Sequence, residues 1–191
     1  MKIFSTSKSM AMAVMFCLAS LAPSAARAQE DTFERSEIAA NVADFFEIGS
    51  VVAGEVVEKI FSDRGAPNAY ITGNEGSAAI GVGLRYGEGN LYFKNGGGPI
   101  KVYWQGPSIG FDIGANASKT FTLVYHLPDA EALYRRFPGI EGSYYFIAGI
   151  GVNYQQAGNV ILAPMRVGIG LRAGVNAGYL SYTRSRRWLP F

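Results

Sequence analysis

Residues 78–86 read AAIGVGLRY, a short apolar run in which glycine occupies the alternate positions 81 and 83. Alternate residues of a β-strand lie on one face, so both glycines leave the same face without side chains. Glycines recur at this spacing in two later runs, at positions 149 and 151 and at positions 168 and 170. A bare face lets a sheet curl tightly or lets another backbone approach closely. The pattern therefore predicts a small, closed or nearly closed barrel and not a flat sandwich.

The chain from Ala69 onward supports this prediction. Short runs of β-branched and aromatic residues, such as AYIT (69–72), NLYF (90–93) and KVYW (101–104), alternate with clusters of glycine, asparagine and proline. This spacing is typical of an antiparallel β domain, and closure of the sheet would remove exposed edges that favour aggregation. One segment in this half differs, because PDAEALYRRF (128–137) carries the proline and apolar spacing of a helix.

The segment before Ala69 has helical periodicity. In SEIAANVADFFEIG (36–49) the apolar residues recur every three or four positions behind Ser36, which could serve as the N-cap, and Gly49 ends the run. In VVAGEVVEKIF (51–61), which follows Ser50 as a second possible cap, one face is apolar and the other carries charges. We expect two amphipathic helices, or one kinked helix, over about 36–62.

The first 28 residues have the features of a secretory signal peptide. Lysines at positions 2 and 8 precede an apolar run over about 10–21, and Ala26-Arg27-Ala28 is a small-x-small cleavage site. The apolar run is too short for a stable membrane-spanning helix. We therefore expect cleavage after Ala28, and a mature single domain over 29–191 that has no transmembrane span. Cleavage also removes Cys17, the only cysteine, so the mature chain has no disulfide and no thiolate ligand.

Charge is unevenly distributed along the chain. Cleavage removes three of the 17 basic residues and none of the 15 acidic ones, which changes the net charge from +2 to −1. Nine acidic residues lie between Glu30 and Asp63, and none follows Glu141. No basic helix, zinc finger or aromatic motif typical of nucleic-acid binding is present, so we expect no nucleic-acid partner.

The basic end supplies the candidate ligand-binding site, a positive rim. Its members are Arg166, Arg172, Arg184, Arg186, Arg187 and the neighbouring Trp188. Guanidinium groups bind phosphate or carboxylate in a bidentate manner, and tryptophan favours apolar–polar boundaries. The sequence thus suggests an anionic lipid, lipopolysaccharide or another envelope component as the partner. The alternative is that these arginines only pair with the acidic helices of the same molecule.

An enzymatic alternative comes from GPSIG (106–110), which matches the Gly-x-Ser-x-Gly nucleophile elbow of α/β-hydrolases. Ser108, Asp112 and His126 follow the order of that catalytic triad, so a small serine hydrolase acting on an envelope ester through Ser108 is the second hypothesis. The context argues against it, because the elbow needs a helix after the serine and this sequence predicts further strand. With a single histidine and no mature cysteine, we expect no metal site, no cofactor and no enzymatic activity.

Two resemblances sharpen these expectations. The runs YGEGNLYFKNGG (86–97) and GPSIGFDIGANASKTFTLVY (106–125), followed by DAEALYRRF (129–137), resemble the SYLF domain. SYLF domains are lipid-binding β modules with an amphipathic helical start. The helical start here is acidic, so an anionic lipid would have to meet the arginine-rich end.

A closer resemblance covers nearly all of the mature chain. The runs KVYWQGPSIGFDIGANASKTFTLVYHLP (101–128) and LAPMRVGIGLRAGVNAGYLSYTRSRRWLPF (162–191) are similar to the alphaproteobacterial family of envelope integrity protein A. This resemblance implies a mainly β fold, a small soluble antiparallel β-barrel of about eight strands with N-terminal helices. It also implies a periplasmic, non-enzymatic protein that supports cell-envelope integrity and resistance to envelope stress.

Overall fold

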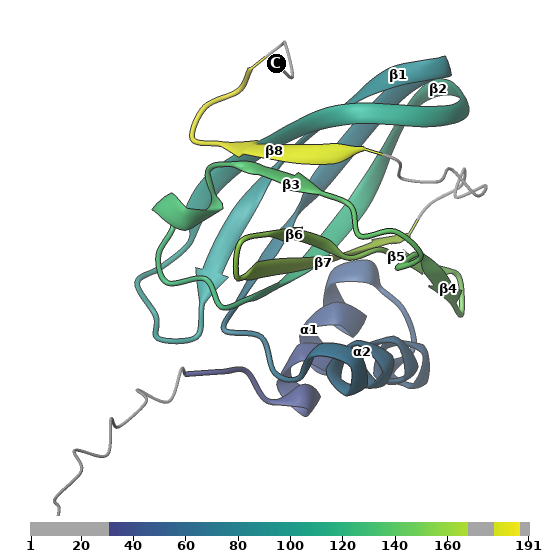
Figure 1. Ribbon diagram of the computed structural model, residues 1–191. Coiled ribbons are helices and arrows are strands. Elements are labelled where there is room, and N and C mark those ends of the chain that lie inside the picture. The colour runs from purple at the N-terminus through teal and green to yellow at the C-terminus, as the bar shows by residue number, and fades with distance from the viewer. Residues whose placement is uncertain (1–30, 168–177, 188–191) are drawn as a thin grey trace, which may run out of the picture.

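The computed structural model describes residues 31–167 and 178–187, with the backbone alone at 77–82 and 108–117. Two helices, α1 (Arg35–Phe46) and α2 (Ser50–Arg64), precede a single antiparallel sheet (Figure 1). Its strands are β1 (Ala69–Phe93), β2 (Ile100–Tyr125), β3 (Arg136–Pro138), β4 (Tyr145–Ile147), β5 (Ile150–Val152), β6 (Gln155–Ala157), β7 (Val160–Val167) and β8 (Tyr179–Thr183). The predicted mainly β class with N-terminal helices is confirmed.

The helix boundaries differ slightly from the predicted caps. Glu34 precedes α1 and Gly49 precedes α2, and neither residue caps its helix through a side chain. Ser36 and Ser50, the predicted caps, both lie inside the helices. Helix α1 ends at Phe46, and the following residue, Glu47, adopts a left-handed conformation (φ 58°), so the chain turns two residues before Gly49. Tertiary packing of the apolar faces therefore decides these boundaries more than capping does.

Strands β1 and β2 form one long two-stranded ribbon, where the sequence suggested several short strands. They contain 25 and 26 residues and pair from Ala69↔Val124 to Leu91↔Ile100, with one irregularity between Ser77 and Ala79. Glycines therefore do not interrupt these strands. Two glycines that the sequence analysis did not single out allow the ribbon to curl, since a Cβ on Gly89 would lie only 2.2 Å from the Thr72 carbonyl oxygen and 2.9 Å from the Gly73 Cα. The two ends of β1 thus approach each other backbone to backbone.

The edge of β2 that does not pair with β1 pairs with two other strands, and further pairings connect those two strands to each other. Strand β8 pairs with β2 at residues 103–105, and β7 pairs with β2 at residues 119–125. Strand β3 pairs with β8, β6 pairs with β7, and a bridge between Gly139 and Gln155 joins the end of β3 to the start of β6. The described strands therefore enclose a barrel-like interior, which Figure 1 shows.

Two expectations in this half are corrected. The predicted helix over 128–137 is only a 3₁₀ turn at Glu131–Leu133, and β3 begins soon after it, at Arg136. Pairing of residues 136–138 with β8 supplies backbone hydrogen bonds that compete with a helix. Gly149 lies in the turn between β4 and β5 with φ 91°, outside any strand, whereas Gly151 lies in β5. Glycines 168 and 170 lie outside the described residues.

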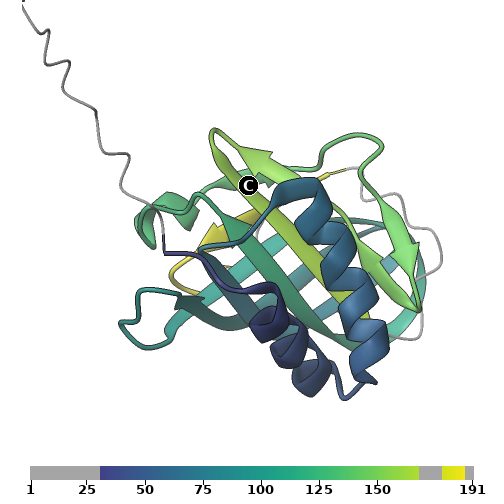
Figure 2. The ribbon, with the colours of Figure 1, turned by 90° about the horizontal axis from the view of Figure 1, so that it is seen from below.

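Two apolar cores lie on opposite faces of the sheet. The inner core fills the barrel and includes Trp104, Phe137 and Tyr182, all nearly inaccessible to solvent. The outer core lies between the sheet and the helices and includes Val42, Ile60 and Phe121 among its members. Figure 2 shows α1 and α2 side by side across the outer face of the sheet. Because the two faces of β2 serve different cores, its alternating side chains are buried on both sides.

None of the helices within residues 31–167 and 178–187 is long and apolar enough to cross a membrane.

Candidate functional site

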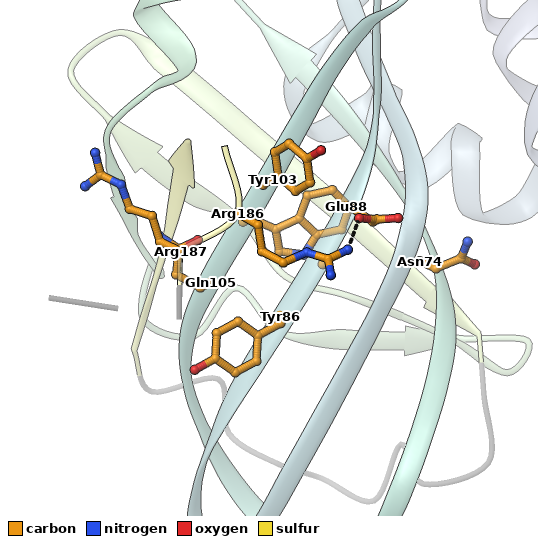
Figure 3. Close-up of a pocket in the computed structure, with 9 residues that line it drawn as sticks. Asn74, Tyr86, Glu88, Tyr103, Gln105, Arg186 and Arg187 are labelled. Atoms are coloured by element: carbon orange, nitrogen blue, oxygen red, sulfur yellow. Dashed lines mark hydrogen bonds and ion pairs between the residues drawn. The ribbon is translucent and has the colours of Figure 1, made fainter. Parts of the chain in front are cut away.

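A small pocket lies where the segment after β8 crosses the β1–β2 ribbon. Tyr86 pairs with Gln105 and Glu88 pairs with Tyr103, so these four side chains lie on one face of the ribbon. Asn74, Gly87, Trp104, Arg186 and Arg187 complete a lining that encloses about 180 Å³. Figure 3 shows the Arg186 side chain extending between the rings of Tyr86 and Tyr103. We call this cavity the arginine–tyrosine pocket.

The electrostatics of the pocket centre on Glu88. Arg186 donates a hydrogen bond to its carboxylate at 2.5 Å, and the Lys101 ammonium lies 3.6 Å from the other oxygen. The Arg186 hydrogen bond, aided by the charges of Lys101 and Arg186, lowers the pKa of Glu88 against the opposing effect of burial. Arg187 is exposed and has no acidic partner among the described side chains. Glu88 thus pairs with two cationic side chains, and Arg187 adds a further positive charge to the lining, so the pocket carries excess positive charge.

Trp104 connects this pocket to the barrel interior. Its indole packs against the bare backbone of Gly87, since a Cβ there would lie 2.1–2.4 Å from ring atoms. The indole Nε1 donates a hydrogen bond of 2.9 Å to the carboxylate of Glu75, whose own exposure is only 4%. A glycine at position 87 is therefore required for the tryptophan to reach this position.

Behind Trp104, Glu75 is held by two arginines. Arg166 donates to both carboxylate oxygens, at 2.9 and 3.3 Å, and to the side-chain oxygen of Asn153 at 2.9 Å. The Arg85 guanidinium lies 3.1 Å from Glu75. Burial raises the pKa of Glu75, but the charges of Arg166 and Arg85 outweigh burial and hold it below the ordinary value. A carboxylate paired in this way stays ionised inside the barrel.

The structure separates the residues of the predicted rim. Arg186 and Arg187 come together in the arginine–tyrosine pocket. Arg184 lies nearby on the surface and forms an ion pair with Glu131. Arg166 is only 5% exposed and points into the barrel, so it is not part of an exposed rim. Arg172 and Trp188 lie outside the described residues.

The acidic partners of these arginines differ from the predicted ones, which were the N-terminal helices. Arg166, Arg184 and Arg186 do pair with acidic side chains of the same molecule. Those acids come from β1 and the 3₁₀ turn, not from the N-terminal helices. The acidic residues of the helices instead pair with other cations, for example Glu47 with Lys119 and Glu37 with Lys94. Internal pairing therefore accounts for three of the four predicted rim arginines that the structure describes, and Arg187 is the exception among these four.

Sequence reasoning did not single out the pocket residues Tyr86, Glu88, Tyr103 and Gln105. A usable signal was present, because 86 and 88 and also 103 and 105 alternate within two runs that each have strand character. Placing those two pairs face to face requires the register of β1 against β2, which the sequence does not show.

The structure does not contain the elbow that the hydrolase hypothesis needs. Ser108 lies within the continuous strand β2, opposite Gly83 of β1, where a nucleophile elbow would form a sharp strand-to-helix turn. His126 follows the end of β2 with φ 56°. Within the described segments, no three histidine, cysteine or acidic side chains gather as a metal site would require.

Comparisons with known proteins agree with this architecture. A search of curated proteins found no match. The chain is similar to a β-barrel-like, uncharacterised protein from Brucella abortus whose crystal structure is known. The two share 47% sequence identity with a TM-score of 0.76, over 84% of this chain and 99% of the other. The resemblance to SYLF domains is not confirmed. The family model of envelope integrity protein A matches residues 31–191, and the chain belongs to that family.

Proposed function

We propose that this protein is a periplasmic, non-enzymatic binding protein that supports envelope integrity by holding an anionic envelope lipid at the arginine–tyrosine pocket. The family name points to the cell envelope. The signal-peptide features of residues 1–28 favour export. The strand backbone at Ser108 favours binding over acyl transfer.

The observation that carries the proposal is the charge of the pocket. Lys101 and Arg186 share the single carboxylate of Glu88, while Arg187 lines the same cavity without an acidic partner in the described chain. Guanidinium groups are weakly hydrated and bind phosphate oxygens through paired hydrogen bonds. An anionic group bound here would neutralise charge that the described side chains leave unbalanced.

The walls and the size of the pocket limit the ligand. Tyr86 and Tyr103 offer amphipathic rings, and Asn74 and Gln105 offer amides that can bind hydroxyl groups. A volume of about 180 Å³ is below the roughly 300–1,000 Å³ of pockets that hold drug-sized ligands. The pocket therefore suits a headgroup, with the acyl chains remaining in the membrane.

Co-sedimentation of the mature chain with lipid vesicles tests the proposal. We expect binding to vesicles that contain phosphatidylglycerol or lipopolysaccharide, little binding to pure phosphatidylcholine, and weaker binding as salt rises. Replacing both Arg186 and Arg187 by glutamine should reduce binding at least several-fold.

A matched control changes the same net charge elsewhere, through Arg35→Gln with Arg136→Gln. Arg35 pairs with Glu58 at the surface, and Arg136 lies over the ring of Tyr179, so neither lines the pocket. This control should bind like the wild type. Equal losses in both double variants would reduce the effect to net charge, and absence of binding to every anionic vesicle would refute the proposal.

A further inference from the structure

A second pocket lies where the segment that follows β2 meets the turn between β6 and β7. It has a volume of about 640 Å³. His126 and Arg135 belong to one wall, and Gln156 of β6 and Asn159 of the turn belong to the other. The three remaining lining residues have apolar side chains without aromatic rings. No residue lines both this pocket and the arginine–tyrosine pocket. We call it the histidine–arginine pocket.

Hydrogen bonds within the chain fix both walls of this pocket. The side chain of Asn68 accepts a hydrogen bond from the Leu127 amide at 3.1 Å and donates one to the Leu127 carbonyl oxygen at 2.9 Å. His126, the residue just before, has a left-handed backbone (φ 56°), which non-glycine residues seldom adopt unless neighbouring contacts hold them. On the other wall, the Gln156 amide donates to the Gly158 carbonyl oxygen at 2.9 Å. The pocket is therefore formed before any ligand binds.

Arg135 brings an unbalanced positive charge into this pocket. Its side chain has no ion pair, hydrogen bond or aromatic contact within residues 31–167 and 178–187. A Cβ on Gly158 would lie 3.8 Å from the Arg135 Nη1, so the guanidinium reaches the opposite wall. The acids nearest in the sequence are engaged elsewhere, because Glu131 pairs with Arg184 and Asp129 accepts a hydrogen bond from a backbone amide. No acidic side chain belongs to the described lining.

The polar groups of the pocket match an anionic sugar. A guanidinium and an imidazole N–H donate hydrogen bonds to a carboxylate or a phosphate. The amides of Gln156 and Asn159 can each donate and accept, as the hydroxyl groups of a sugar require. A cation would meet the charge of Arg135, and an acyl chain would face four polar side chains. The volume lies within the roughly 300–1,000 Å³ of pockets that hold drug-sized ligands.

We propose that the histidine–arginine pocket binds a sugar that carries a carboxylate or a phosphate group. Arg135 and His126 hold the acid group, and Asn159 and Gln156 bind the hydroxyl groups of the ring. This site is separate from the arginine–tyrosine pocket and does not depend on the lipid proposed there. Either proposal can therefore fail without the other.

His126 is the only histidine of the chain, so its ring protons give unique signals in a proton NMR spectrum. Titration of the mature chain with glucuronate, and separately with glucose 6-phosphate, should move these signals to saturation with at least one sugar. Glucose, and sodium chloride at the same ionic strength, should leave the signals unchanged. A response to glucuronate alone would identify sugar carboxylates as the ligand class, and a response to glucose 6-phosphate alone would identify sugar phosphates. Acetate and inorganic phosphate should bind several-fold more weakly, because they lack the ring hydroxyls.

Two variants that keep His126 as the reporter make the test specific. Arg135→Gln should weaken binding of the sugar at least several-fold, whereas Arg136→Gln should not, because Arg136 lies over the Tyr179 ring and outside the pocket. Asn159→Asp preserves the shape of an exposed side chain and adds a negative charge, so it should abolish binding without changing the midpoint of thermal unfolding. No saturable change with either sugar, an equal change with glucose or acetate, or unaltered binding in Arg135→Gln would overturn the proposal.

Discussion

The barrel interior and the surface near the carboxyl end both hold arginines against glutamates, but they do so under different physical conditions. Arg166 and Glu75 have side chains that are 7% and 4% exposed, with Arg85 and Trp104 completing the contacts of the carboxylate. Arg184 and Glu131 are 65% and 64% exposed and form an ion pair at the surface, where Arg184 also lies over the ring of Tyr134. An arginine–glutamate ion pair is thus part of the buried core in one region, and in the other it lies in solvent, where its members can change partners.

The difference arises from the surrounding solvent. Removing one member of a buried pair leaves a charge that water cannot reach, whereas an exposed partner is immediately solvated. The interior cluster should therefore govern folding, and the exposed arginines should be free to exchange Glu88 or Glu131 for a ligand.

The largest effect that separates the two regions should come from Arg166→Met. This change keeps much of the side-chain volume but leaves Glu75 with Arg85 as its only buried cation. We expect a loss of about 3–5 kcal/mol in the free energy of unfolding, measured by denaturant titration. Adding Glu75→Gln to this variant should recover part of the loss, and failure to recover any would show that Arg166 acts through packing alone.

A smaller effect should appear in the dependence of stability on pH. The pKa of Glu75 is lowered in the folded protein, so its stabilising contribution is present above the ordinary glutamate pKa of about 4.3 and is lost as the pH falls through the lower folded value. We expect the wild type to lose stability below about pH 4.3, and Glu75→Gln to be less stable at neutral pH with a shallower acid decline. Glu88→Gln should change the loss of stability in acid less than Glu75→Gln does, because Glu88 is at the surface. If both variants lost stability in parallel as the pH fell, the special role of the buried Glu75 would be contradicted.

The smallest effect should come from Arg184→Gln. Its ion pair with Glu131 is exposed, so we expect a change in unfolding free energy below about 1 kcal/mol that disappears at high salt. Glu131→Gln should give the same result. A salt-independent loss as large as that of Arg166→Met would mean that the surface pair belongs to the folded core.

Much of the fold could be predicted from residue patterns. The periodicity of 36–62 predicted two helices or one kinked helix, and the short β-branched and aromatic runs after Ala69 predicted the antiparallel sheet; the structure has two helices and that sheet. The lengths of β1 and β2 could not be predicted, because glycines that usually separate strands here lie where backbones or an indole pack closely. The 3₁₀ turn at Glu131–Leu133 was mistaken for a helix, since pairing of the following residues with β8 depends on distant parts of the chain.

In the candidate site, too, some features could be predicted from the sequence and others depend on the tertiary structure. The sequence by itself determined that the carboxyl end is basic, that residues 29–191 carry no cysteine, and that residues such as 86 and 88 share a face of a strand. Only the tertiary structure decided that Arg166 turns into the barrel towards Glu75, 91 positions away, while Arg186 turns outward to Glu88. The reason is that strand alternation assigns residues to two faces but does not say which face is enclosed. That choice depends on the register and curl of the whole sheet.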